Sequence, residues 1–423
     1  MAKRIQPGFN FDESLLLANF SKQAYEIFKY DDGTIDDIEL RDVYNSMYRS
    51  QKWKFAHSLR NDETSIRGFI VKKEGAEHYA VVIQGTTMSE GAMLDFTDLV
   101  NDVNWELVSY GSVTNKKIKV LGVVLEGIES ILDEIYIFFK TLLGQLKEKD
   151  FAEISQMTNE RQFACITAMA DAGQYRLGEE FFNSCRNLIE EAVEDGQIGN
   201  NEDLVKILNF QKPTLLQLEK VDDPIDVYVT GHSLGAAMAI LCAVDLRTYF
   251  ASDMVIKVYT VGTPKAGNAD FAKYYQERIG KGMSYRIHNL LDPVTAMPFP
   301  LPFPLDALVS NGIRVGNFYL GNTAHVGEEH QVAGLGSQGV SLDFGGTLSL
   351  FGGIPFPHSP DTYIQLIEED RERWEAWARP IENIMGTFMK EILDNQTEEL
   401  REELNRIQRK IEKLENFQKS SNE

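Results

Sequence analysis

Ser233 lies in the pattern Gly231-His232-Ser233-Leu234-Gly235, which places a potential nucleophile between two glycines. Alternating apolar residues over 225–229 come before it, and small and apolar residues fill 236–249 after it. Strand, tight turn and helix is the context that a nucleophile elbow requires. A sharp, strained turn holds the hydroxyl clear of the sheet, and glycines let the flanking backbones approach closely. The pattern therefore predicts nucleophilic chemistry at Ser233.

A serine hydroxyl needs an imidazole as base and a carboxylate that orients the imidazole. In doubly wound hydrolases the acid and then the histidine follow the serine along the chain. Asp292 is the favoured acid because it comes just after a predicted strand over 284–289, where loops build active sites. Asp253 and Asp270 fall in a connection and at a helix start, where a solvated or capping role is expected. Three later histidines are candidates for the base, namely His325, His330 and His358.

The surrounding segments predict an α/β fold with a mostly parallel sheet covered by helices on both faces. Apolar periodicity indicates helices over 11–29, 160–193 and 271–279. Strands are expected over 53–59, 64–72, 79–84, 225–229, 257–261 and 284–289. The run over 79–84 is continuously apolar, which is typical of a strand buried on both faces.

A long apolar stripe runs through residues 113–148, within a larger insertion at about 107–160. Acidic residues are expected to gather on the opposite side of this helix, namely Glu126, Glu129, Asp133 and Glu134. These acids exclude a membrane-spanning helix, since each costs about 2.5 kcal/mol or more at the bilayer centre. Two interpretations stay open: an ordinary core-packing helix, or a lid-like apolar cover or interfacial helix over a lipid site.

Three further segments are distinctive. Proline excludes 297–305 from a central strand, so this apolar stretch and the glycine-rich 344–357 are expected to be loops. Leucine and isoleucine recur at spacings of four and three from Leu393 to Leu414, as at the a and d positions of a short coiled coil. This C-terminal helix is a candidate for homodimer formation or for folding back on the body of the protein.

Composition limits the partners and the compartment. The 423 residues include 64 acidic and 42 basic residues, for a net charge of -22. Such a surface argues against nucleic acid and restricts membrane contact to local apolar segments. The three cysteines form no disulfide framework and no zinc pattern. No apolar run follows the basic N-terminus, so no signal peptide is seen; a cytoplasmic location is expected, with leaderless export as the alternative.

Several segments, taken in order, resemble the class 3 lipase family, the α/β-hydrolases that include the fungal triacylglycerol lipases. The matching segments are 82–86, 95–99, 231–235, 262–268, 286–293, 325–328 and 358–363. The resemblance covers about residues 10–370 and implies an α/β-hydrolase domain over 1–379, followed by the amphipathic helix over 380–423. The segment 175–181 departs from the family, because it keeps only a glycine of the usual His-x-Gly-Phe.

The resemblance also implies a set of site residues. They are the nucleophile Ser233, the acid Asp292, the base His358, and the oxyanion-hole donors Thr86 and Leu234. His358 is preferred over His325, whose motif is usually structural in the family. His232 is expected to be a packing residue, because the residue before the serine points away from the substrate.

The expected function is hydrolysis of lipid carboxylic esters through an acyl-enzyme, without a metal or cofactor. The sequence does not encode the headgroup preference. Two alternatives stay open: a lipase-like scaffold for protein interaction, and an acyltransferase or thioesterase that uses the same triad.

Overall fold

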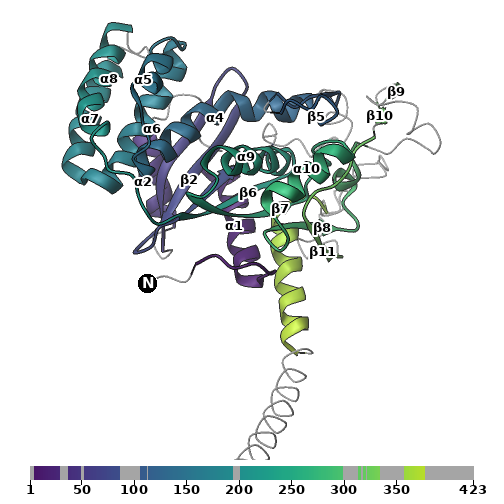
Figure 1. Cartoon of the computed structure of the whole chain (residues 1–423). Helices are drawn as coiled ribbons and strands as arrows, with labels where there is room; N and C mark the ends of the chain where they lie inside the picture. The colour runs from purple at the N-terminus through teal and green to yellow at the C-terminus, as the bar shows by residue number, and fades with distance from the viewer. Residues whose placement is uncertain are drawn as a thin grey trace, which may run out of the picture. The chain divides into compact units, whose positions relative to one another are not determined.

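The fold is seen in a computed structural model of the chain (Figure 1). The structure describes residues 4–28, 37–48, 52–85, 105–111, 113–193, 201–298, 313–315, 318–320, 322–333 and 357–376. The chain divides into two compact units, residues 1–367 and 368–423. In the second unit only residues 368–376 are described, and they are helical. The predicted division at residue 379, the coiled coil over 380–423 and most of both apolar loops lie outside the described residues and stay predictions.

A seven-stranded sheet forms the centre of the described part of the first unit. Its strands, in spatial order, are β1 (Trp53–Asn61), β2 (Ile66–Lys73), β3 (His78–Ile83), β6 (Ile225–His232), β7 (Met254–Val261), β8 (Ser284–Asn289) and β11 (Glu328–Val332). The first two pairings are antiparallel, and every pairing from β3 to β11 is parallel. The predicted strands are confirmed, and so is the mostly parallel character of the sheet.

Two small antiparallel ladders accompany the main sheet. They are β4 (Leu107–Ser109) with β5 (Lys119–Leu121), and β9 (Ile313–Val315) with β10 (Phe318–Leu320). An isolated bridge joins Val120 of β5 to Gly267, which in turn bridges Ala324. These bridges fasten the segments before α4 and β11 to the loop after β7.

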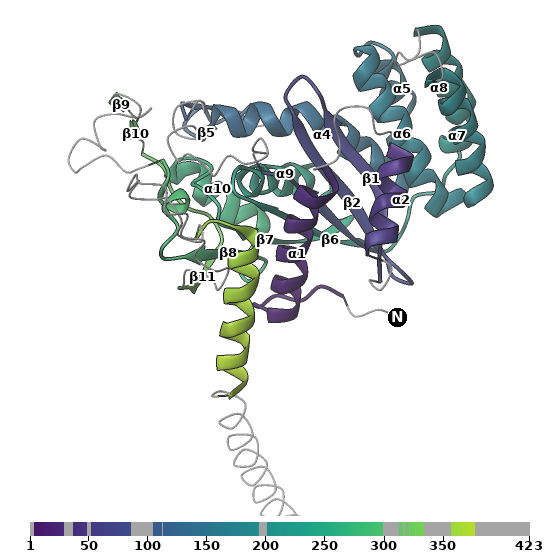
Figure 2. The same ribbon diagram turned by 180° about the vertical axis from the view of Figure 1, so that it is seen from behind.

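Helices cover both faces of the sheet, as predicted (Figure 2). One face carries α4 (Gly122–Leu143), α9 (Leu234–Phe250) and α10 (Ala269–Ile279), and the other carries α1 (Phe11–Phe28), α2 (Asp37–Met47) and the helical residues 360–367. Each face of the sheet has its own hydrophobic core, and alternate residues of β3 point into the two cores. Val81 and Ile83 pack in the core under α4 and α9, and Ala80 and Val82 pack in the core under α1. The continuous apolar run is therefore explained by burial on both faces.

Four helices gather beside α4 at the β1 end of the sheet, away from β8 and β11 (Figures 1 and 2). They are α5 (Glu148–Ile154), α6 (Asn159–Leu177), α7 (Glu179–Val193) and α8 (Asn201–Leu215). The predicted helix over 160–193 is thus two helices, which divide at Gly178 (φ +92°). In the described part of the chain, no helix is both long enough and apolar enough to cross a bilayer.

Helix α4 is an ordinary core helix. Most of its apolar side chains are buried, with Ile128, Ile135 and Phe138 completely so, and the helix packs on α6, α9 and β1. The lid-like interpretation of residues 113–148 is therefore not supported for α4, because its apolar face is already covered by the protein.

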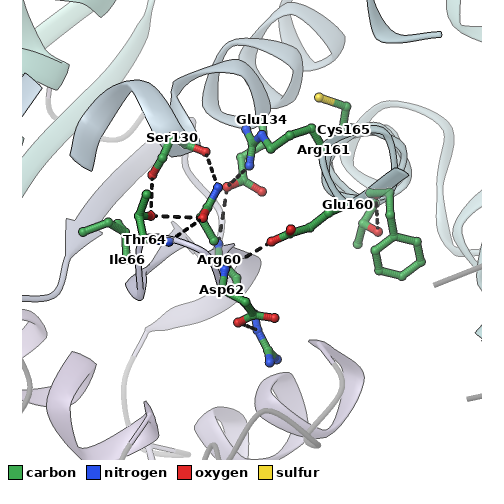
Figure 3. A network of polar contacts seen from close by, with 12 residues as sticks. Arg60, Asp62, Thr64, Ile66, Ser130, Glu134, Glu160, Arg161 and Cys165 are labelled. Atoms are coloured by element: carbon green, nitrogen blue, oxygen red, sulfur yellow. Dashed lines mark hydrogen bonds and ion pairs between the residues drawn. The ribbon is translucent and has the colours of Figure 1, made fainter. Parts of the chain in front are cut away.

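Glu134 was expected on the outer, acidic side of this helix, and that expectation is wrong. Its side chain is buried, accepts a hydrogen bond from the backbone N–H of Arg60 at 3.3 Å, and pairs with Arg161 at 3.5 Å. Close by, the Thr64 and Ser130 hydroxyls are 2.9 Å apart. Figure 3 shows how these side chains join the turn between β1 and β2 to α4 and α6. A buried carboxylate persists there because cationic and N–H donors stabilise its charge.

His57 on β1 extends this buried network. Its Nδ1 lies 2.8 Å from Asp171 of α6, its Nε2 lies 3.7 Å from Glu134 of α4, and Arg41 of α2 also binds Asp171. Burial by itself lowers the pKa of His57, but the hydrogen bond to Asp171 and the Glu134 carboxylate outweigh it and raise the pKa to about 9. The protonated ring thus links α4, α6 and the edge of the sheet.

The His57 pKa leads to a stability prediction. Because its folded-state pKa is raised, the stabilisation is fully present below pH 6.5 and is lost as the pH rises through about 9. The wild-type protein should lose roughly 2–3 kcal/mol of unfolding free energy over this window, at about 1.4 kcal/mol per pKa unit. Urea unfolding at pH 6.5 and 9.5 measures this loss, and His57→Gln should remove most of it. Parallel pH curves for the two proteins would contradict the assignment.

Candidate active site

The turn at Ser233 is tight and strained. Strand β6 ends at His232, α9 begins at Leu234, and Ser233 between them has φ +59° and ψ −131°. Residues other than glycine rarely adopt a positive φ, and such strain clusters at functional sites. A Cβ at Gly231 would lie 2.5 Å from the backbone of Gly235. The strand, turn and helix of the predicted elbow are therefore present, and both glycines are needed sterically.

The end of β3 lies against this turn. A Cβ at Gly235 would be 2.4 Å from the carbonyl oxygen of Ile83, and one at Gly85 would be 3.1 Å from the Ser233 Cβ. The chain that leads to Thr86 therefore passes beside Ser233. Thr86 itself lies outside the described residues, so its role stays a prediction. Leu234 begins α9, where a backbone N–H has no intrahelical partner and is available to an oxyanion.

Asp292 follows the parallel strand β8 and caps the short 3₁₀-helix η1 (Pro293–Ala296). It is 3% exposed. Its Oδ1 accepts the backbone N–H of Val294 at 2.9 Å, while Oδ2 lies 2.7 Å from His358 Nδ1 and accepts the Tyr363 hydroxyl at 2.7 Å. This carboxylate is thus oriented from both sides and directs one oxygen to the imidazole.

His358 is fully buried just before the helical residues that begin at 360. Its ring centroid is 4.5 Å from that of His232, the residue before Ser233. Gly262 (φ +59°) packs against the imidazole of His358: a Cβ at position 262 would lie only 3.1 Å from that ring. The structure therefore brings Asp292 and His358, which are 66 residues apart in the sequence, into one hydrogen-bonded pair beside the elbow.

The competing candidates lie elsewhere or have other partners. Asp253 lies before β7, at the amino ends of the parallel strands, whereas Asp292 lies at their carboxyl ends. Asp253 pairs with Lys220 at 3.0 Å. Asp270 is in the first turn of α10. His330 on β11 stacks on Phe9 with ring centroids 3.9 Å apart.

His325 is an unsuitable base for a different reason. Burial, followed by the nearby charges of Arg286 and Lys265, lowers the pKa of His325 to about 3. The ring is therefore a weak proton acceptor at neutral pH. The preference for His358 over His325 agrees with this environment.

The structure adds residues that motif reasoning did not assign to the site. Tyr363 donates to the acid, Asn289 donates to the Pro357 carbonyl at 3.0 Å, and Tyr25 bonds to His232. Tyr363 belongs to a matching segment of the family, and that was its only signal. Nothing in the local pattern of α1 points to Tyr25, because its partner is 207 residues away.

Within the described ranges, a metal site would require several ligand side chains that converge on one point. Among those residues, no three or more His, Cys, Asp and Glu side chains converge in a way that could hold a metal ion. The residues brought together are instead those of acyl transfer: a hydroxyl on a strained turn, an imidazole, and a carboxylate that orients the imidazole.

The steric argument at the elbow is testable. Gly235→Ala should lower the melting temperature by about 5 °C or more or prevent folding, because the new Cβ overlaps backbone that cannot move without disturbing β3. Overpacking typically costs about 1–3 kcal/mol, and more against fixed backbone. Gly111→Ala is the matched control, since its Cβ meets nothing within 4 Å. Thermal unfolding of both purified variants measures the difference. Equal melting temperatures would show that the turn tolerates the methyl group.

Known proteins share the elbow region. The model of the family "Lipase (class 3)" matches residues 207–301, which include Ser233 and Asp292. The chain is 40% identical over 77 residues to phospholipase A(1) DAD1 of Arabidopsis thaliana, which is 18% of this chain and 17% of that protein. It is 41% identical over 83 residues to a lipase of Rhizomucor miehei, which is 19% of this chain and 22% of that protein. The chain thus spans about a fifth of the length of these relatives.

A comparison of structures gives a similar neighbour. A Rhizomucor miehei lipase propeptide complex aligns over 78% of this chain and 69% of that chain, with a TM-score of 0.41 and 16% sequence identity. The family match over residues 207–301 coincides with the strained elbow and with the loop that carries Asp292. The part of the chain that contains the elbow and Asp292 is therefore similar to the class 3 lipase family.

Proposed function

We propose that this protein is a serine hydrolase that cleaves carboxylic esters of lipids. The observation that carries the proposal is the 2.7 Å hydrogen bond between Asp292 and His358 beside the strained turn of Ser233. In a Ser-His-Asp triad, the carboxylate sets the imidazole tautomer and stabilises the imidazolium that forms. Here Asp292 accepts from Nδ1 of His358, which leaves Nε2 as the proton acceptor for the serine.

The reaction then follows from the placement of the groups. His358 takes the proton from Ser233, whose oxygen attacks the ester carbonyl. The backbone N–H of Leu234, with Thr86 as the second donor, stabilises the oxyanion, and each such donor contributes about 3 kcal/mol. His358 passes the proton to the leaving alcohol, and an acyl-enzyme remains. Water, activated by the same imidazole, attacks the acyl-enzyme and releases the acid.

Lipid is the proposed substrate class for two reasons. Matching relatives are named phospholipase A(1), lipase, and secreted mono- and diacylglycerol lipase, so the names share a reference to lipids as substrates. In addition, Leu290 and Leu291 are 54% and 50% exposed directly before Asp292. Two exposed leucines on the rim of the site suit contact with a lipid surface, to which an acidic protein has no general electrostatic attraction.

The nucleophile assignment has a direct test. Ser233→Ala should reduce the hydrolysis of a p-nitrophenyl ester at least about 10³-fold, because the other triad members cannot replace the nucleophile. A fluorophosphonate probe should label the wild-type protein at Ser233 and leave the variant unlabelled, as shown by mass spectrometry of the peptide. Full activity in Ser233→Ala would exclude this mechanism. A wild-type protein that resists the probe would favour the scaffold alternative.

The leucine pair gives a second prediction. Replacing Leu290 and Leu291 together by Ser should lower the rate on phospholipid vesicles or emulsified acylglycerol at least about tenfold, since full burial of even one leucine contributes about 1.5–3 kcal/mol. The rate on a soluble short-chain p-nitrophenyl ester should change by less than twofold. Phe210→Ser is the matched control, because Phe210 is 46% exposed on α8, at the other end of the sheet. An equal loss on soluble and dispersed substrates would reject surface contact.

A further inference from the structure

His232 is a buried histidine that the proposed proton transfer does not use. It lies directly before Ser233, is 4% exposed, and has partners at both ring nitrogens. Nδ1 lies 3.0 Å from the Tyr25 hydroxyl, and Nε2 lies 2.5 Å from the backbone carbonyl oxygen of His358. Two hydrogen bonds are more than the simple packing role expected for this residue requires.

The carbonyl assigns the tautomer. A carbonyl oxygen can only accept, so Nε2 of His232 must carry the proton and donate to His358. The neutral ring then offers Nδ1 as an acceptor, and Tyr25 donates its hydroxyl proton to it. Burial, together with the adjacent His358, holds the pKa of His232 well below its usual value of 6.5. The ring therefore stays neutral at the pH at which His358 must work as a base.

Tyr25 joins this pair to the end of β3. Its hydroxyl accepts the backbone N–H of Gly85, the residue before Thr86. The fit leaves no room for a side chain at position 85, since a Cβ at Gly85 would lie 2.3 Å from the Tyr25 oxygen and 2.5 Å from the His232 carbonyl oxygen. One series of hydrogen bonds thus runs from Gly85 through Tyr25 and His232, the residue directly before the serine, to the backbone of His358.

We infer that Tyr25 and His232 are positioning residues, which hold the backbone of the catalytic base in register with the nucleophile and with the loop of the oxyanion hole. The inference rests on the proposed function. Asp292 fixes the side chain of His358 through Nδ1, whereas His232 fixes the main chain from which that side chain extends. Both constraints are needed, because a displacement of about 1 Å in a catalytic group can cost about 10²-fold in rate.

The test compares two substitutions at one position. His232→Leu removes the donor to the His358 carbonyl and should lower kcat for a p-nitrophenyl ester about 100-fold, with KM within about threefold of wild type. His232→Gln keeps an amide N–H that can donate to the carbonyl and an oxygen that can accept from Tyr25, so it should restore kcat at least about tenfold relative to Leu. The kcat of Tyr25→Phe should lie between those of His232→Leu and His232→Gln.

Tyr275→Phe is the matched control. It also removes a buried hydroxyl, one that lies 2.8 Å from Ser284 Oγ at the start of β8, far from the turn at Ser233. Its kcat should stay within twofold of wild type when every variant is assayed well below its own melting temperature. Hydrogen exchange over residues 357–363 should accelerate in His232→Leu and remain unchanged in Tyr275→Phe.

The possible results separate the inference from the function that it rests on. A His232→Leu variant with kcat within twofold of wild type, or a Gln variant no better than Leu, would overturn the positioning role. A wild-type protein without Ser233-dependent turnover would instead refute the proposed function. In that case the exchange rates over 357–363 still decide whether His232 holds this segment: faster exchange in His232→Leu supports the inference, and unchanged exchange rejects it.

Discussion

The close approach of three backbone segments around Ser233 is the constraint on which the site depends. Strand β6, the start of α9 and the end of β3 pack so tightly that Gly231 and Gly235 have no room for a Cβ. The positive φ of Ser233 is strained by itself, and the surrounding packing must maintain it. The same packing brings the Leu234 N–H, the chain before Thr86 and the serine hydroxyl to one place. The conformation of the elbow and the position of the end of β3 are therefore set by the same steric constraint.

Buried polar groups hold the parts of this site together, and the same device recurs at the far end of the sheet. Beside the elbow, Asp292 accepts hydrogen bonds from Tyr363 and His358, and His232 accepts one from Tyr25. At the β1 edge, protonated His57 sits between the carboxylates of Glu134 and Asp171. Buried polar groups are costly unless they are satisfied, so these networks select one arrangement of helices around the sheet. Helix α4 is fixed in the core in this way, and a cover over the site would have to come from another segment.

The similarity to known proteins lies in the region that contains the elbow and Asp292. The family match includes Ser233 and Asp292, and the aligned relatives share only about a fifth of their length with this chain. Helices α5 to α8 lie at the other end of the sheet from β8, whose loop carries the acid (Figures 1 and 2). These helices therefore lie away from the loop that carries Asp292.

The sequence by itself determined the elements whose signals are local. The alternation before Ser233, the continuous apolar run of β3 and the two elbow glycines specify strand, turn and helix, because burial and steric limits act within a few residues. It also ordered serine, acid and histidine, but it left three histidines open until the family resemblance favoured His358. Only the tertiary structure showed that Glu134 faces the core, that α4 is no cover, and that Tyr25 reaches His232. An apolar period identifies which face of a helix is buried and does not identify what buries it. Contacts between residues 207 positions apart exist only once the sheet has brought α1 beneath the elbow.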